Sequence, residues 1–228
     1  MNRLQAELKR LYPAPTEAGV RALVLELTGA GAWEHLARAW HGVQADLQLP
    51  APGIAVSGSG YQLWFSVAPA VPKEQALAFL ASLRERYLAD APAQRLRTLP
   101  AAAAAPQITA TPPGEHAEER WSAFVAPDLA ALFADEPWLD LPPGSDAQAD
   151  LLSRLQCMAA EDLQRAVAAR RAPATVAAAR FDAGAASPQD PRAFLLAVMN
   201  DPAIELPLRI EAAKALLPYF EGQRAPAR

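Results

Sequence analysis

The chain has 228 residues, a formal net charge of −4 and a single cysteine, Cys157. This length is sufficient for one sizeable domain or two small ones with a buried core. One cysteine excludes a disulfide framework and a cysteine-based zinc site. The acidic excess argues against a strong non-specific nucleic-acid binder, which normally carries a basic surplus.

The sequence contains no segment typical of a membrane or secreted protein. No apolar run approaches the roughly 20 residues that a membrane-spanning helix needs. Residues 1–9 are a polar mixture without the apolar stretch of a signal peptide. We therefore expect a cytoplasmic protein without membrane contact.

The first hundred residues alternate between strand-like and helix-like patterns. An apolar run over 21–28 predicts a buried strand, and apolar residues at helical spacing over 33–49 predict a helix. Strand-like runs over 53–57 and 61–67 flank a Gly-Ser-Gly turn and predict a hairpin. A second helix begins at Pro72, and a fourth strand is expected over 95–99.

The resulting order is strand, helix, strand, strand, helix, strand. This order is typical of the ferredoxin-like or RRM-like βαββαβ fold, an α+β fold whose two helices cover one face of an antiparallel sheet. The other face is left open. Large apolar residues gather over 119–141, including Trp121 and Trp138, and we expect this segment to cover that face and to complete a domain over 1–141.

The remainder is predicted to be helical. A helix is expected over 142–168, followed by an Ala- and Pro-rich linker over 169–190. Asp190 and Pro191 suit a helix start, and residues 191–222 predict a helical hairpin. So small a hydrophobic hairpin is expected to need a protein partner or self-association.

Three features of the sheet are candidates for function. An ionised Glu26 in an apolar strand is costly unless paired, so it is either a metal ligand or, as we expect, the partner of an arginine. The backbone of Ser57, Gly58 and Gly60 could cradle a phosphate, although a plain hairpin turn is commoner. Trp64 could stack a base on an open sheet, but packing beneath 119–141 is the preferred interpretation.

No catalytic constellation emerges from the sequence. His35 and His41 share one predicted helix but lie six residues apart, on different sides, and His116 falls in a predicted loop. Cys157 stands among apolar residues, which favours a small buried side chain over a nucleophile. We expect no cofactor and no metal.

Two motifs together resemble a known family. Glu26 lies in the run Leu-Val-Leu-Glu-Leu-Thr, which a Trp-containing helix follows, and Ser57–Phe65 reads Ser-Gly-Ser-Gly-Tyr-Gln-Leu-Trp-Phe. This stretch, within residues 21–99, resembles the palm of archaeo-eukaryotic-type primases and primase-polymerases. The resemblance implies two acidic metal ligands on the first strand, a histidine facing nucleotide phosphate in the turn, and a third carboxylate on a later strand.

This chain departs from that pattern at three positions. The second acidic position is Thr28, the histidine position is Gln62, and residues 95–99 hold no Asp or Glu. Nucleotidyl transfer needs Mg²⁺ held by at least two carboxylates. The resemblance is therefore to a degenerate palm, for which we expect no enzymatic activity.

The C-terminal hairpin resembles a segment of phage terminase small-subunit-like proteins, where it contributes to helical assembly. Together the two resemblances imply a non-catalytic binding or assembly module linked to nucleic-acid transactions, in a mobile-element setting. The alternative is a protein-protein interaction adaptor without nucleic-acid contact. The net acidic residues 1–140, with 11 basic and 15 acidic side chains, support the alternative.

Overall fold

The computed structural model describes residues 2–101, 108, 110–168 and 214. The chain divides into two units, Met1–Ala174 and Thr175–Arg228. The linker predicted over 169–190 and the hairpin predicted over 191–222 lie outside the described residues. Among the helices that are described, none combines the length and the apolar character needed to cross a membrane.

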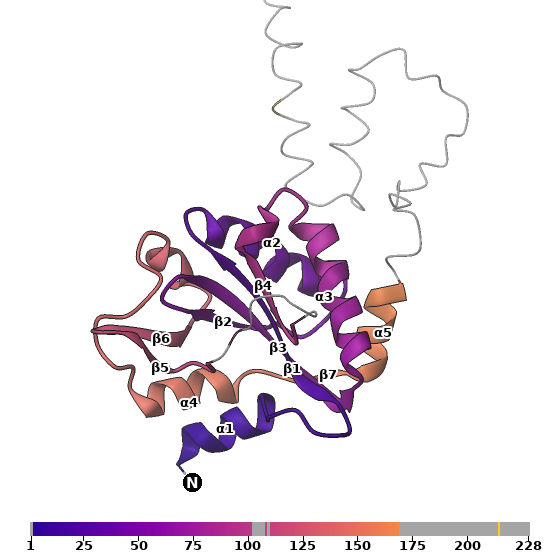
Figure 1. Cartoon of the computed structure of the whole chain (residues 1–228), viewed down its shortest axis with the longest axis horizontal. Coiled ribbons are helices and arrows are strands. Elements are labelled where there is room, and N and C mark those ends of the chain that lie inside the picture. Colours follow the sequence, from indigo (N-terminus) through magenta and orange to yellow (C-terminus); the bar gives the residue numbers. More distant parts are fainter. Residues whose placement is uncertain (1, 102–107, 109, 169–213, 215–228) are drawn as a thin grey trace, which may run out of the picture. The chain divides into compact units, whose positions relative to one another are not determined.

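The first unit combines helices with a curled antiparallel sheet, which confirms the expected mixture of the two (Figure 1). The strands are β1 (Val20–Thr28), β2 (Gly53–Val56), β3 (Gly60–Val71), β4 (Leu96–Leu99), β5 (Gly114–Ala117), β6 (Arg120–Val125) and β7 (Met158–Ala159). The helices are α1 (Arg3–Leu11), α2 (Ala32–Ala45), α3 (Lys73–Tyr87), α4 (Ser145–Ser153) and α5 (Ala160–Ala168), with 3₁₀ turns η1 (Ala93–Arg95) and η2 (Ala130–Phe133).

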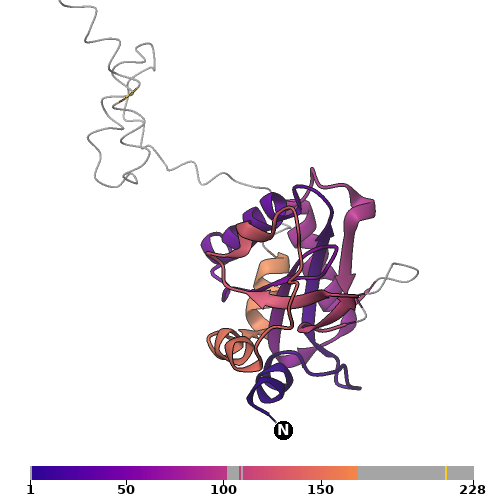
Figure 2. The same cartoon turned by 90° about the vertical axis from the view of Figure 1, so that its left-hand side faces the viewer.

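The strands of the main sheet lie in the order β4-β1-β3-β2-β6-β5, and all of these neighbours are antiparallel. The short β7 pairs in parallel with β3, beside Val67 and Ala68. In Figure 2 the salmon β5 and β6 run across β1 to β3, the indigo and purple strands that precede them in the sequence. This crossing makes the curl of the sheet visible. The register places Glu26 of β1 opposite Gln62 of β3 and Arg97 of β4.

One face of the sheet carries the larger core, which α2, α3 and α5 cover. Side chains alternate along β3 as the sequence predicts, because successive residues of a strand point to opposite faces. Tyr61, Leu63, Phe65 and Val67 therefore lie in this core. The helix predicted over 33–49 ends earlier, at Ala45, and Gln48 adopts a positive φ of 53° that a helix cannot contain.

The other face is covered by α1 and α4, which lie side by side beneath the sheet (Figure 1). The expectation that residues 119–141 would cover it is wrong. Their first part is strand β6, which extends the sheet beyond β2, and Phe124 is its contribution to this second core. Helix α1 was not predicted, although its Asn2 and Gln5 form a capping box that marks a helix start.

The single helix predicted over 142–168 is also wrong, and the domain does not end at residue 141. The segment folds as α4, a short stretch containing β7, and α5. Leu152 of α4 belongs to the second core, whereas Leu163 of α5 belongs to the first. A straight helix cannot reach both faces of one sheet, so the helical segment must be interrupted between α4 and α5.

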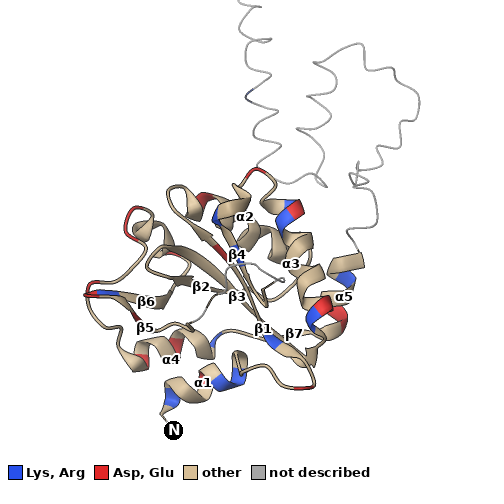
Figure 3. Cartoon of the chain, in the orientation of Figure 1, with Lys and Arg blue, Asp and Glu red and all other residues tan. Residues whose placement is uncertain are grey.

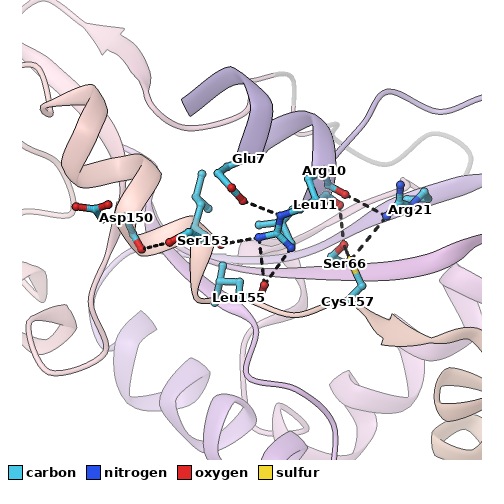
Figure 4. A network of polar contacts seen from close by, with 10 residues as sticks. Glu7, Arg10, Leu11, Arg21, Ser66, Asp150, Ser153, Leu155 and Cys157 are labelled. Atoms are coloured by element: carbon cyan, nitrogen blue, oxygen red, sulfur yellow. Dashed lines mark hydrogen bonds and ion pairs between the residues drawn. The ribbon is translucent and has the colours of Figure 1, made fainter. Parts of the chain in front are cut away.

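Polar contacts fix the second layer onto the sheet. Gln148 of α4 binds both backbone groups of Phe124, accepting from its N–H and donating to its carbonyl, each at 2.9 Å. Arg10 of α1 donates to the carbonyls of Leu152 and Leu155 at 3.0 and 3.2 Å (Figure 4). The Gln148 bonds satisfy buried backbone groups of β6, and the Arg10 bonds join α1 to the end of α4.

Candidate functional site

A small polar cavity borders the second face of the sheet, where β1, β3 and β4 meet the β5–β6 hairpin. Its volume is about 90 Å³. Its polar lining includes Glu26, Ser57, Gln62, Arg97, His116 and Ser122. Three of the residues singled out from the sequence, Glu26, Ser57 and Gln62, are therefore brought together, whereas Gly58 and Gly60 border a different hollow and Trp64 lies in the core.

Glu26 is held by a chain of buried hydrogen bonds. Its side chain accepts from the Gln62 amide at 3.1 Å, and the Gln62 carbonyl oxygen accepts from the Trp64 indole N–H at 2.8 Å. Glu26 is only 2% exposed. The neutral Gln62 thus serves as a donor to one neighbour and an acceptor to the other, a pairing that an amide can make and a carboxylate cannot.

Arg97 balances the charge of Glu26. This confirms the expectation from the sequence that Glu26 pairs with an arginine. Arg97 Nη1 lies 3.7 Å from Glu26 Oε2, and the Arg97 side chain is 41% exposed. Glu26 Oε2 makes no hydrogen bond and is the buried oxygen that faces this ion pair. The arginine therefore links the buried carboxylate to solvent at the rim of the sheet.

The arrangement limits what the cavity can do. Its volume equals roughly that of three water molecules and is well below the 300–1,000 Å³ of typical small-molecule pockets. Within the described residues, no group of three or more His, Cys, Asp and Glu side chains is placed to bind a metal ion. The site can hold a small polar group against Glu26, but it is too small for a nucleotide.

Two backbone N–H groups of the glycine-rich turn already donate hydrogen bonds within the protein. The N–H of Ser57 donates to the Gly60 carbonyl at 2.9 Å, and the N–H of Gly58 donates to the Pro137 carbonyl at 2.8 Å. The neighbouring hollow is lined by Asp135, whose charge opposes a phosphate. The phosphate-cradle hypothesis is thus not favoured by the geometry of the turn.

The glycines have steric roles instead. Gly58 has φ +86°, and a Cβ there would lie 2.4 Å from Cδ2 of His116. A Cβ on Gly60 would lie 2.2 Å from the Leu27 carbonyl oxygen. The turn therefore needs glycine in order to pack closely on β1 and β5, since both distances are shorter than a van der Waals contact.

Trp64 cannot stack a base, because it is 1% exposed. It packs against Tyr12 and Phe124, with ring centroids 5.0 and 5.8 Å away. Trp64 is therefore packed, as preferred, but beneath α1 and α4, and of residues 119–141 only Phe124 contacts it. Tyr61 and Phe65, the other large aromatic residues of β3, are equally buried in the other core.

The environments of two side chains, His116 and Cys157, were not fully foreseen from the sequence. His116, expected in a loop, lies on β5 and lines the cavity. Cys157 packs against the second core, as expected of a small apolar side chain, but its Sγ also lies 3.0 Å from the Ser66 hydroxyl and 3.7 Å from Arg21 Nη2 (Figure 4). Both environments are created by segments distant in sequence, so no local pattern signals them.

We expect Arg97→Ala to lower the free energy of unfolding by about 2 kcal/mol, because it leaves Glu26 buried beside Gln62 without a charge partner. This value lies below the range for fully buried pairs, since solvent screens the exposed arginine. In a Glu26→Gln background the same change should cost less than about 0.5 kcal/mol. Urea denaturation of the four proteins of this cycle measures the coupling.

Arg154→Ala is the matched control, since Arg154 is exposed and its side chain forms no hydrogen bond or ion pair within the described chain. Its unfolding free energy should stay within about 0.5 kcal/mol of the wild type. Equal costs for Arg97→Ala in both backgrounds would show that the ion pair does not stabilise the site.

Comparison of the chain with protein-family models, with curated proteins and with solved structures finds no match.

Proposed function

We propose that this protein is a non-catalytic binding and assembly module built on a degenerate primase-like palm. The observation that carries the proposal is the state of Glu26, the one acidic palm position retained in the sequence. Its carboxylate is buried, bonded to Gln62 and paired with Arg97. A carboxylate engaged in this way stabilises the fold and is not free to hold a catalytic metal ion.

The palm assignment draws support from the sheet. The order β4-β1-β3-β2, antiparallel throughout, with α2 and α3 on one face, supports the ferredoxin-like arrangement that we propose for this part of the chain. The family that the sequence resembles has the same order of strands and helices. The second layer formed by α1 and α4 is an addition that covers the face on which a palm would work.

A protein partner is favoured over nucleic acid by the described surface. The aromatic residues that could stack bases are buried, and the turn that could hold a phosphate is satisfied internally. Residues 1–140 carry 15 acidic and 11 basic side chains, a balance that repels a phosphate backbone. The nucleic-acid link rests on the two sequence resemblances and is an outcome to be measured.

The direct test is nucleotide incorporation on primed and unprimed DNA templates with Mg²⁺ and with Mn²⁺. We expect no incorporation above background from the wild type or from Glu26→Gln, a variant that keeps an acceptor for Gln62. Incorporation by the wild type that disappears in Glu26→Gln would overturn the proposal, because it would assign Glu26 a catalytic metal.

Titration with labelled single- and double-stranded DNA at about 50 mM salt separates the two partner classes, since phosphate contacts are strongest at low salt. We expect no binding. Salt-dependent binding with a steep slope would favour the nucleic-acid alternative over the adaptor.

A further inference from the structure

Residues 126–141, most of the segment that joins β6 to α4, have an unusual composition, and we name them the acidic strap. It contains four carboxylates, Asp128, Asp135, Glu136 and Asp140, and no Lys or Arg occurs between residues 121 and 153. All four carboxylates are exposed, and within the described part of the chain none of them forms an ion pair. In Figure 3 this loop carries the red of Asp and Glu and none of the blue of Lys and Arg.

The backbone of the acidic strap is fixed on the sheet at several points along its length. The bonds are Tyr61 hydroxyl to Ala130 carbonyl at 2.7 Å, Gly58 N–H to Pro137 carbonyl at 2.8 Å, and two backbone bonds between Trp121 and Leu139 at 2.8 and 2.9 Å. In addition, the Arg120 guanidinium lies 4.3 Å from the Trp138 ring centroid. A surface held in this way loses little conformational entropy when it binds a partner.

Although it is fixed, the acidic strap turns three of its leucines outward, whereas Phe133 and Leu139 pack against the core. Leu129, Leu132 and Leu141 are 47%, 77% and 75% exposed, and they are the exposed large hydrophobic residues of the described chain. Leu129 and Leu132 are joined by one 3₁₀ hydrogen bond, from the Leu132 N–H to the Leu129 carbonyl at 3.0 Å. Residues three apart in a 3₁₀ turn lie on the same side, so these two leucines form one apolar ridge.

We propose that the acidic strap is the docking surface for a basic amphipathic helix of a protein partner. Exposed leucines on a segment whose carboxylates form no ion pair within the described chain are complementary to a segment with apolar residues on one side and Lys or Arg at its margins. A nucleic acid is not the occupant, because its phosphates would meet four like charges. The inference deepens the proposed binding function by naming the partner's chemistry, and it rests on that function.

The test uses the full chain and a fluorescein-labelled peptide of about 18 residues, with leucines at helical spacing and lysines elsewhere, a length that supports a helix. We expect the Leu129→Ser/Leu132→Ser variant and the Asp135→Asn/Glu136→Gln variant each to weaken binding about tenfold. Glu17→Gln/Glu74→Gln, which changes two exposed carboxylates outside the strap, should leave the Kd unchanged. Far-UV circular dichroism verifies that each variant is folded.

Backbone amide chemical shifts supply a second readout that does not depend on substitution. The expected result is that shifts on titration concentrate in residues 126–141 and that a peptide with Glu in place of Lys does not bind. Absence of binding at about 100 μM peptide, equal binding of the acidic peptide, or a Kd unaffected by both strap variants would overturn the proposal. In that case an absence of nucleotide incorporation would still support the non-catalytic module, so the two failures are distinguishable.

Discussion

Replacement of Trp64 by alanine is expected to lower the free energy of unfolding by about 4 kcal/mol, the largest effect of any substitution considered for this protein. Trp64 is almost fully buried between Tyr12 and Phe124, so its loss leaves a cavity between the sheet and α1. It also removes the indole N–H that donates to Gln62. Urea denaturation of the full chain, followed by far-UV circular dichroism, measures the change.

Trp64→Phe separates the two contributions. Phenylalanine keeps most of the ring volume but leaves the carbonyl oxygen of Gln62 without its donor, at a cost of about 1–3 kcal/mol. We therefore expect an intermediate loss of stability. If Trp64→Ala left the free energy of unfolding unchanged, Trp64 would have to lie at an accessible surface, and the base-stacking hypothesis would regain its place.

The second large effect is expected at Gly60. Gly60→Ala should lower the free energy of unfolding by about 3 kcal/mol, because the new Cβ would lie 2.2 Å from the Leu27 carbonyl oxygen and 2.6 Å from the Thr28 Cα. Both neighbours are backbone atoms of β1, so neither can rotate away as a side chain could. The turn and the β1–β3 pairing must therefore shift. Thermal and urea unfolding of the variant measure the loss.

Gly144→Ala is the matched control. Gly144 precedes α4 with φ −62°, and an added Cβ there meets no atom within 4 Å. We expect its stability to change by less than about 1 kcal/mol. If Gly60→Ala were as mild as Gly144→Ala, the close approach of the turn to β1 would not constrain residue 60, and the turn would be free to serve another purpose.

These two substitutions bear on the sequence motif that suggested a primase-like palm. In the structure, Gly60 permits close packing and Gln62 bridges Glu26 to Trp64. Gln62, one of the residues that depart from the pattern of the resembled family, thus forms a connected, buried unit with Glu26 and Trp64. This connectivity explains physically how the sheet accommodates a carboxylate at Glu26, and it supports a structural role for the motif.

Local patterns in the sequence were sufficient for the elements between residues 20 and 99. Apolar runs of period two and helical spacing distinguish strands from helices, and glycines mark the turn. Strand alternation places Tyr61 and Trp64 on opposite faces of β3, because strand geometry determines it without reference to other elements. The need of a buried carboxylate for a positive partner likewise predicted an arginine beside Glu26, which is Arg97.

Only the tertiary structure decided what covers the second face of the sheet. An amphipathic segment signals that it has an apolar side, but not which surface will bury that side. For this reason helix α1 was not predicted, and residues 119–141 were expected over the sheet although β6 lies at its edge. The interruption between helices α4 and α5 was not foreseen for the same reason. The same holds for the acidic excess of the chain. The sequence determined the net charge, but only the fold decided that four of the carboxylates lie exposed on the acidic strap together with outward-facing leucines.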